Sequence, residues 1–396
     1  MPSHAPPGVN VFLRLLPITL AVFIGFLAIG LPLPVLPLHV HDGLGLSPLV
    51  VGVVIGAQFA AALLSRAWAG HLADTRGARR AVVTGLLVSA SAGLAYLASL
   101  ACATPAASAG VLLLGRVLLG CGESLVVTGA LSWGVGLAGP QNAGKVMAWV
   151  GIAMYGAYAL GAPAGVAVHA AHGFAGIAAA SGLAPLLALG AVWGVRAVAP
   201  TAARRTPFYR VLGSVWLPGL GLALSSVGFG VLTAFIALLF AAKGWGNAGL
   251  AFTAFGLAFI GARLLFGHLP DRLGGARVAL VCVVVEAVGQ LLIWGADTAA
   301  LAYLGAALTG FGYSLAFPGF GVEAVRRAPP QSRGVAMGAY VAFLDIALGI
   351  TGPALGAVAG AWNVGTVYLA GAVAVGLSLL VAVGLLAAPL PGGHHA

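Results

Sequence analysis

Long apolar stretches separated by short polar loops make up almost the whole chain. A transmembrane helix needs about 20 mostly apolar residues, and division of the sequence on that length gives twelve candidate spans. They cover approximately residues 14–38, 49–72, 81–102, 109–133, 144–168, 175–197, 213–240, 249–269, 277–296, 299–323, 334–358 and 365–388. This pattern predicts an all-α polytopic membrane protein that contacts a lipid bilayer.

Composition supports this prediction and narrows the functions that remain. Hydrophobic residues make up 61% and charged residues 7% of the 396 residues, whereas about 25% of residues are charged in a soluble domain. The net charge of +10 does not indicate a nucleic-acid partner, because the basic residues lie in short loops between apolar runs. Cys102, Cys121 and Cys282 lack the spacing of a metal site or a disulfide framework, so we expect no metal.

The distribution of basic residues between alternate loops predicts the orientation of the chain. Among the basic residues in the predicted loops, only Lys243 lies on the side opposite the N-terminus. The loops on the N-terminal side carry Arg14, Arg76, Arg79, Arg80, Lys145, Arg196, Arg204, Arg205, Arg210, Arg272, Arg277, Arg326, Arg327 and Arg333. Cytoplasmic loops are enriched in lysine and arginine, so both termini are predicted to be cytoplasmic.

Three short motifs occur once in each half of the chain, which predicts two related six-helix bundles. Residues 70–80 resemble 267–277, residues 120–125 resemble 310–315, and residues 161–165 resemble 351–356. The predicted parts are an N-terminal tail (1–13), a first bundle (14–198), a linker (199–212), a second bundle (213–388) and a C-terminal tail (389–396).

Four motifs resemble those of the major facilitator superfamily and occur in the same order along the chain. Residues 70–80 are similar to its G-x-L-A-D-R-x-G-R-R signature, and residues 116–122 to R-x-x-x-G-x-G. Pro34–Pro37 and Gly161–Gly165 are similar to the P-x-x-P and G-P-x-x-G motifs of its twelve-span drug:proton antiporter branch, and residues 311–353 resemble poorly characterised bacterial efflux permeases for sugars, drugs or metabolites. The resemblance implies a major facilitator fold, alternating access, and a location in the bacterial cytoplasmic (inner) membrane. We expect a monomer.

Only three acidic residues fall inside the apolar zone, Glu123, Glu286 and Asp345, because Glu323 stands at the inner end of its predicted span. An ionisable residue at membrane depth costs at least about 2.5 kcal/mol, so each needs a reason to be there. Arg116 and Glu123 are seven residues apart and share one helix face, and the resemblance directs that face toward a central cavity. We predict that Glu123 binds a proton and that Arg116 regulates it. The alternative is a permanent structural ion pair with no part in transport.

The first predicted span contains no acid, although many drug:proton antiporters have one there. Asp345 is therefore predicted to take part of that role, and the alternative is a hydrogen-bonded packing residue. Glu286 and Gln290, one turn apart, are predicted to form a structural polar contact. The other residues predicted to line the cavity are Phe23, Phe26, Gln58, Tyr155, Tyr158, Phe229, Phe235, Tyr313, Phe317 and Tyr340.

The repeated charged motif is predicted to act as a cytoplasmic gate, because a carboxylate at a helix end can pair with arginines and cap a neighbouring helix. Its members are Arg66, Asp74, Arg76, Arg79, Arg80, Arg263, Asp271, Arg272 and Arg277. The alternative for Arg79 and Arg80 is simple topology-setting charge. A second set is predicted to allow close helix packing: Gly161, Pro163, Gly165, Gly352 and Pro353.

Taken together, these patterns predict a proton-driven exporter of a small organic compound, with the proton gradient as its energy source and no cofactor. One alternative is a symporter or facilitator that imports a sugar or organic acid. An alternative of another class is a non-transporting receptor or scaffold. We expect no enzyme, because the sequence contains no HExxH, GxSxG or phosphate-binding loop.

Overall fold

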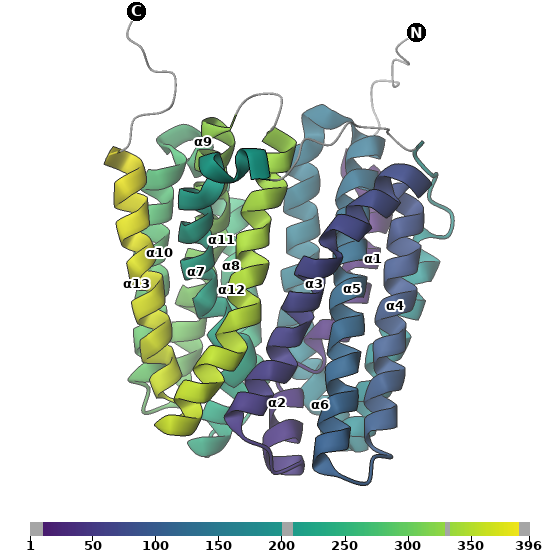
Figure 1. The fold of residues 1–396 in the computed structure, drawn as a ribbon, viewed down its shortest axis with the longest axis vertical. Helices are drawn as coiled ribbons and strands as arrows, with labels where there is room; N and C mark the ends of the chain where they lie inside the picture. Colours follow the sequence, from purple (N-terminus) through teal and green to yellow (C-terminus); the bar gives the residue numbers. More distant parts are fainter. Residues whose placement is uncertain (1–10, 200–208, 329–332, 388–396) are drawn as a thin grey trace, which may run out of the picture.

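The structure, a computed structural model, describes residues 11–199, 209–328 and 333–387. These ranges form helices joined by short turns (Figure 1). In chain order the elements are α1 (Val11–Gly30), α2 (Leu36–Leu38), η1 (His39–Gly43), α3 (Pro48–Arg76), α4 (Ala78–Ser99), α5 (Pro105–Ala138), η2 (Pro140–Asn142), α6 (Ala143–Val192), α7 (Tyr209–Ala242), α8 (Gly249–Phe266), α9 (Leu269–Leu273), α10 (Gly275–Trp294), α11 (Ala299–Arg327), α12 (Arg333–Ala361) and α13 (Thr366–Ala387). Most of the predicted linker, with Arg204 and Arg205, and nearly all of both predicted tails lie outside the described residues.

Eleven helices of the described chain are long and apolar enough to cross a membrane, and one of them crosses it twice. Helix α6 is 50 residues long, but Gly173 interrupts it with φ 62° and ψ −163°. Glycine adopts this positive φ at little steric cost. Trp133 Nε1 of α5 donates to Arg196 O at 2.8 Å, so the chain returns after Gly173 to the end where α6 begins. The described residues therefore make twelve crossings, and the predicted twelve-span fold is confirmed.

The first span is shorter as a helix than the sequence predicted. Helix α1 ends at Gly30, eight residues before the predicted end of the span. Prolines follow at 32, 34 and 37, and proline has no N–H group to continue a helix. The chain instead passes through a turn, α2 and η1 before α3 begins.

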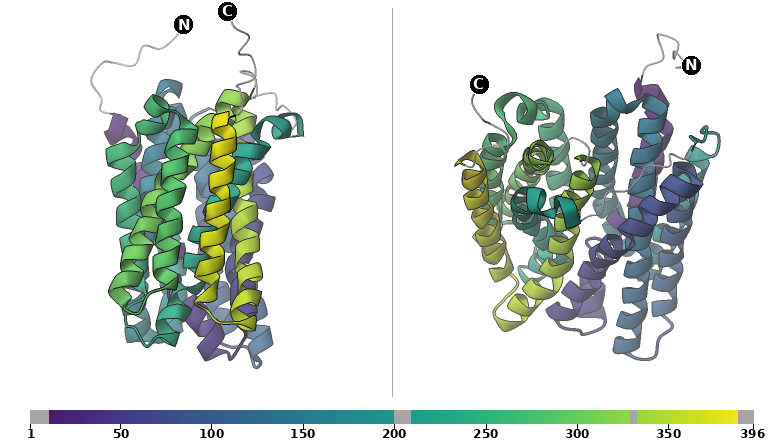
Figure 2. Two further views of the ribbon diagram at one scale, coloured as in Figure 1. Left: turned by 90° about the vertical axis from the view of Figure 1, so that its left-hand side faces the viewer. Right: turned by 45° about the horizontal axis from the view of Figure 1, so that its top comes forward.

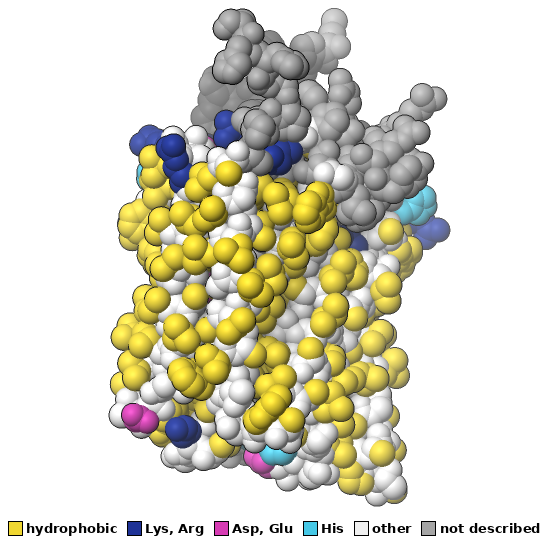
Figure 3. All heavy atoms as spheres, turned by 60° about the vertical axis from the view of Figure 1, so that its left-hand side comes forward, with side chains coloured by type: hydrophobic (Ala, Val, Ile, Leu, Met, Phe, Trp, Pro, Cys, Tyr) yellow, Lys and Arg dark blue, Asp and Glu magenta, His cyan; other side chains and the backbone are white. Residues whose placement is uncertain are grey.

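The helices form two bundles that meet along α3, α6, α8 and α12 (Figure 1 and Figure 2). Helices α3 and α12 lie close together at one end of the molecule and diverge toward the other (Figure 1). Helix α1 begins and α13 ends at this second end, which we call the termini end; the opposite end is the far end. Lysine and arginine side chains gather mainly at the termini end, and apolar side chains cover the middle (Figure 3). Such an apolar belt suits contact with lipid.

Candidate functional site

A cavity of about 230 Å³ lies between the two bundles. Its polar lining residues are Arg66, Glu123, Ser124, Arg263 and Asp345. Its aromatic lining residues are Phe59, Tyr155, Tyr158, Phe229, Phe259, Tyr313 and Phe317. These side chains come from helices of both bundles, so movement of one bundle against the other changes the shape of the cavity.

The cavity is closed at the far end by two close helix crossings. In the crossing of α3 with α12, a methyl group added at Gly56 would lie 2.7 Å from Gly349 O. In the crossing of α8 with α6, a methyl group added at Gly256 would lie 2.8 Å from Tyr155 O. The Thr253 hydroxyl strengthens the second crossing by donating to Ala159 O at 2.7 Å. Only glycine allows the backbones to approach this closely.

The glycines and prolines predicted to allow close packing lie at such contacts. A methyl group added at Gly161 would lie 3.1 Å from Cα of Gly30, so this residue packs α6 against the end of α1. Gly165 approaches the next residue of the same segment, Leu31. Pro163 of the first bundle contacts Gly249 of the second, because a methyl group added at Gly249 would lie 2.9 Å from Cα of Pro163.

Gly352 and Pro353 belong to the crossing between α3 and α12. An added methyl group at Gly52 would overlap the carbonyl of Gly352 and lie 3.0 Å from Pro353 N. Each bundle therefore contributes one glycine–proline segment to the closed far end.

Toward the termini end the cavity adjoins a wider hollow of about 1020 Å³. The two spaces share four lining residues, Met147, Arg263, Phe317 and Met337. The cavity therefore adjoins a hollow at the end where α3 and α12 diverge, so the protein is open at the termini end and closed at the far end (Figure 1).

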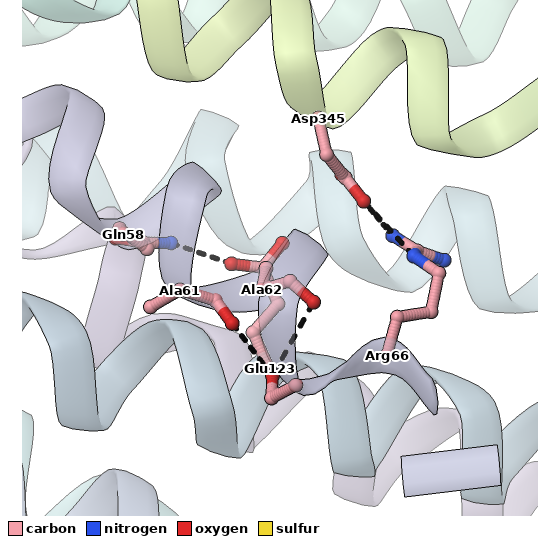
Figure 4. A network of polar contacts seen from close by, with 7 residues as sticks. Gln58, Ala61, Ala62, Arg66, Glu123 and Asp345 are labelled. Carbon is pink, nitrogen blue, oxygen red and sulfur yellow. Dashed lines mark hydrogen bonds and ion pairs between the residues drawn. The ribbon is translucent and has the colours of Figure 1, made fainter. Parts of the chain in front are cut away.

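An ion pair between Arg66 and Asp345 joins the two bundles inside the cavity (Figure 4). Arg66 of α3 donates to Asp345 Oδ2 of α12 through Nε at 2.9 Å and also through Nη2. The Asp345 side chain is 5% exposed and that of Arg66 is 29% exposed. Arg66 was predicted to point to the gate, but this bond directs it into the cavity instead. The sequence contained both residues but no signal that they pair.

Glu123 lies in the cavity and is bonded to an amide rather than to a cation. Its Oε2 atom accepts a hydrogen bond from Gln58 Nε2 at 2.6 Å (Figure 4). Neither the ion pair of Arg66 with Asp345 nor that of Arg327 with Glu323 involves Glu123. Gln58 was predicted to line the cavity, but it is fully buried behind the cavity wall and reaches the cavity only through its bond to Glu123.

Arg116 does not line the cavity with Glu123, although their spacing predicted a shared face. Its side chain is 1% exposed and lies beside Tyr96 of α4, away from the cavity. Its Nε and Nη2 atoms have no hydrogen-bond partner within the described ranges. Phe26 also lies behind the wall, with its ring centroid 6.1 Å from that of Tyr158. Seven residues leave the two side chains within about 20° of each other around α5 but about 10 Å apart along it, and at the level of Arg116 the side chain packs beside Tyr96 of α4.

A cluster of aromatic rings forms the opposite wall of the cavity. Tyr155 of α6 stacks on Phe259 of α8 with centroids 3.7 Å apart, and Phe229 of α7 stacks on Tyr313 of α11 at 5.5 Å. Arg263 lies against this wall, 5.2 Å from the centre of the Phe259 ring. The cavity thus has a polar wall built mainly from α3, α5 and α12 and an aromatic wall from α6, α7, α8 and α11.

Arg263, like Arg66, was predicted for the gate but lines the cavity. The remaining predicted gate residues lie at the termini end, where the bundles diverge (Figure 1). Arg76, Arg79 and Arg80 line a groove beside the end of α6, and Arg79 Nη2 donates to Trp193 O at 2.8 Å. Asp74, the acid of this motif, lies near the end of α3. In the second bundle, Asp271 and Arg272 line the hollow at the termini end and Arg277 lines a smaller one. Because the bundles are apart at this end, the structure represents the open state of any such gate.

The capping role that was predicted for a motif aspartate is filled in the second bundle by Glu323. Its Oε1 atom accepts from Ala276 N at 3.3 Å, at the start of α10, and its Oε2 atom lies 3.6 Å from Arg327 Nη2. A carboxylate at a helix N-terminus is favoured by the helix dipole. The available signal was an acid one turn before an arginine at the end of a span.

Glu286 and Gln290 each bond to neighbouring helices. Glu286 Oε2 accepts from the Ser225 hydroxyl at 2.9 Å, and Gln290 Nε2 donates to Thr309 Oγ1 at 3.1 Å and to Gly228 O at 3.3 Å. Both side chains are fully buried in the second bundle, outside the cavity. The described part of the chain contains no group of three or more histidine, cysteine or acidic side chains placed to hold a metal.

Comparison with known proteins agrees with this architecture. The family model of the Major Facilitator Superfamily matches residues 18–246 and 218–395. An uncharacterized MFS-type transporter of Salmonella typhimurium is 48% identical over 340 residues, which are 86% of this chain and 88% of that protein. An uncharacterized MFS-type transporter of Pseudomonas aeruginosa is 46% identical over 384 residues, 96% of each chain.

Solved structures with the same fold include a mutant of the nucleoside transporter NupG and a bacterial homologue of the human lysosomal transporter Spinster. The NupG structure has a TM-score of 0.75 at 14% identity, and the match covers 94% of this chain and 99% of that one. The Spinster homologue, in an inward-facing and unoccupied conformation, has a TM-score of 0.69 at 14% identity, and the match covers 96% of each chain. The chain therefore belongs to the Major Facilitator Superfamily and is a multi-pass membrane transporter rather than an enzyme.

Proposed function

We propose that the protein is a proton-coupled secondary transporter of a small organic compound, working by alternating access, with Glu123 as the proton-binding group. The observation that carries this proposal is the bond between Glu123 and the neutral side chain of Gln58, inside the cavity. A cationic partner favours the charged form of a carboxyl group, as Arg66 does for Asp345. A carboxyl bonded to an amide can instead gain and lose a proton without breaking an ion pair.

The orientation that we propose places both termini in the cytoplasm and the protein in the bacterial cytoplasmic membrane. Basic side chains in the loops at the termini end support this orientation, since cytoplasmic loops carry an excess of lysine and arginine. With this orientation the protein is open to the cytoplasm and closed to the exterior. Opening of the exterior side then requires the Gly56–Gly349 and Gly256–Tyr155 contacts to separate.

Two modes of coupling are candidates. The antiporter-like motifs favour export of the cargo in exchange for protons. A second mode, cotransport of a proton with an organic acid, is favoured by a specific observation: Arg263 lines the cavity but forms no ion pair within the described residues.

The test of the proposal uses the purified protein in proteoliposomes and compares uptake of radiolabelled glucuronate, glucose and glucosamine. These three compounds have the same ring and differ in charge, and liposomes without protein measure passive entry. We expect a pH gradient to drive accumulation through the wild-type protein. We expect Glu123→Gln to abolish that accumulation but to retain counterflow of the same compound down its own gradient. Asp297→Asn, the same chemical change at an exposed residue of the far end, serves as the control.

The direction of the pH gradient that drives accumulation inside the vesicles distinguishes the two modes. Cotransport fills vesicles whose exterior is acidic, and exchange fills vesicles whose interior is acidic. Accumulation driven by pH that is unchanged in Glu123→Gln contradicts the role of Glu123.

A further inference from the structure

Two arginines occupy equivalent positions in the repeat but have different partners. Arg66 and Arg263 each stand eight residues before the aspartate of the repeated motif, and both line the cavity. Arg66 is paired with Asp345. Arg263 Nη2 donates to a backbone carbonyl, Ser314 O, at 2.7 Å, and its buried Nε atom has no hydrogen-bond partner in the part of the chain that the structure describes. No acidic side chain of the described residues forms an ion pair with Arg263.

The position equivalent to Asp345 is occupied by a neutral side chain in the other bundle. Tyr155 stands eight residues before Pro163, as Asp345 stands eight residues before Pro353. Tyr155 also lines the cavity. A phenol offers a hydroxyl group but carries no charge near neutral pH. The repeat of the pair therefore keeps its arginine, as Arg263 of the second bundle, and replaces its acid with an aromatic ring, as Tyr155 of the first bundle.

We propose that Arg263 binds the carboxylate of the cargo, so that the cargo is a small organic anion. The inference rests on the proposed function in one respect, that the cavity between the bundles holds the transported compound. A guanidinium group matches the planar geometry of a carboxylate and can bond both of its oxygens. A charge that is desolvated without a partner is costly, and a carboxylate from the cargo offsets that cost.

The surroundings of Arg263 provide for the rest of such a compound. The aromatic wall of Tyr155, Phe229 and Phe259 offers ring faces to an apolar or cyclic body. Arg263 also lines the hollow at the termini end, so a compound that enters from that end meets this arginine before the cavity. The cavity volume of about 230 Å³ limits the body to roughly one or two rings.

The balance of charges explains how an anion and a proton move together. The cavity carries two arginines, Arg66 and Arg263, and two acids, Glu123 and Asp345. With Glu123 ionised and no cargo, these four charges sum to zero. With a proton on Glu123 and an anion on Arg263 they again sum to zero, whereas either ligand alone leaves one net charge. A net charge in a low-dielectric site is unfavourable, so the empty and the doubly loaded states change conformation most easily.

The remaining ionisable groups near Glu123 do not alter this balance. They are Arg116 of its own helix, Tyr158 of α6 and Tyr313 of α11, besides Arg66 and Asp345 of the pair. Both tyrosines are neutral near neutral pH, and Arg116 lies behind the wall with a charge that is the same in every state.

The experiment measures the affinity of purified full-length protein for matched pairs of compounds by isothermal titration calorimetry at one fixed pH. The pairs are benzoate with benzamide and glucuronate with glucose. We expect at least one acid to bind about tenfold or more tightly than its neutral counterpart. Arg263→Gln is expected to remove this preference, Arg263→Lys to retain part of it, and Lys145→Gln, an exposed charge at the termini end, to leave it unchanged.

If neither acid binds more tightly than its neutral counterpart, or if Arg263→Gln keeps the preference in a folded protein, the inference is wrong. If Arg263→Gln does not fold, Tyr155→Asp replaces it, because an acid at position 155 should bind Arg263 and exclude the cargo carboxylate. Failure of the proton role of Glu123 is separate: it removes coupling to the pH gradient but leaves the preference for the acid at fixed pH.

Discussion

The polar and the aromatic wall of the cavity derive from equivalent parts of two repeated halves. Glu123 of the first bundle stands where Tyr313 stands in the second, between a glycine and a serine in both. Gln58, eight residues before Arg66, corresponds to Phe255, eight residues before Arg263. In both comparisons the first bundle has a side chain that binds protons or polar groups and the second has an aromatic ring.

The repeated backbone and the differing side chains serve different purposes. The crossings of α3 with α12 and of α8 with α6 are related by the repeat, and both depend on glycine at the contact. Such symmetric contacts suit two bundles that rock against each other. The proposed chemistry of binding resides instead where the halves differ, at Glu123, Asp345 and Arg263, which has no acidic partner among the described residues. Four measurements test whether the two halves differ in this way.

The largest effect is expected when the ion pair between Arg66 and Asp345 is broken. Asp345→Asn leaves Arg66 without its acid. Removal of one partner costs about 3–5 kcal/mol for a fully buried pair, and the 29% exposure of Arg66 reduces this to about 2–3 kcal/mol. The loss should appear as a lower midpoint of thermal unfolding in detergent. The double variant Arg66→Gln with Asp345→Asn should be more stable than Asp345→Asn alone; additive losses would show that the pair contributes nothing.

The glycine crossings should respond next. Gly256→Ala places a methyl group 2.6 Å from Ala159 Cβ and should destabilise the closed far end by about 2 kcal/mol. Gly261→Ala on the same helix is the matched control, because no atom lies within 4 Å of the added group. Spin labels on α6 and α8 at the far end would measure the separation of the bundles. An equal effect of the two substitutions would argue against the crossing as the closure.

Tyr155→Asp gives Arg263 an acid at the position that corresponds to Asp345. The new carboxylate should pair with Arg263 and lower the affinity for an organic acid about tenfold, or about 1.4 kcal/mol, without the same effect on its amide. Calorimetry with benzoate and benzamide measures both affinities. Tyr155→Asn, which is polar but uncharged, is the control, and an equal loss for both variants would assign the effect to the lost aromatic ring.

The smallest effect concerns the far end, where the first span ends early and His39 stacks on Phe174 with centroids 3.8 Å apart. Burial lowers the pKa of His39 below its ordinary value of 6.5, and nearby His169 lowers it further. The folded state thus favours neutral His39, and the stability that this gives is present above the ordinary pKa and is lost as the pH falls. His39→Gln should reduce the loss of unfolding free energy between neutral pH and about pH 5 by no more than about 0.5 kcal/mol, and melting temperatures at the two pH values measure this change. An unchanged pH profile would exclude this contribution.

The sequence was sufficient to predict the twelve spans, the two related halves and the superfamily, because each rests on apolar run length or on short motifs. It placed Glu123, Asp345, Tyr155 and Tyr313 among the cavity residues, and all four line the cavity. The antiporter branch, the export direction and proton coupling stay predictions.

Other features depend on contacts that no local pattern encodes. The pair of Arg66 with Asp345 joins residues 279 positions apart. The direction of Arg116 depends on how α5 packs against α4, because residues near the edge of a helix face can turn to either neighbour. The early end of α1 was visible in its prolines, but apolar run length alone extended the span past them.

The central claim, that Glu123 takes up and releases a proton, can be tested without knowledge of the cargo. Infrared difference spectroscopy of the purified protein detects the carbonyl band of a carboxylic acid that becomes protonated as the pH is lowered. We expect such a band in the wild-type protein and in the exposed control Asp297→Asn, and its loss in Glu123→Gln. A band that persists unchanged in Glu123→Gln would show that another group binds the proton and would contradict the account.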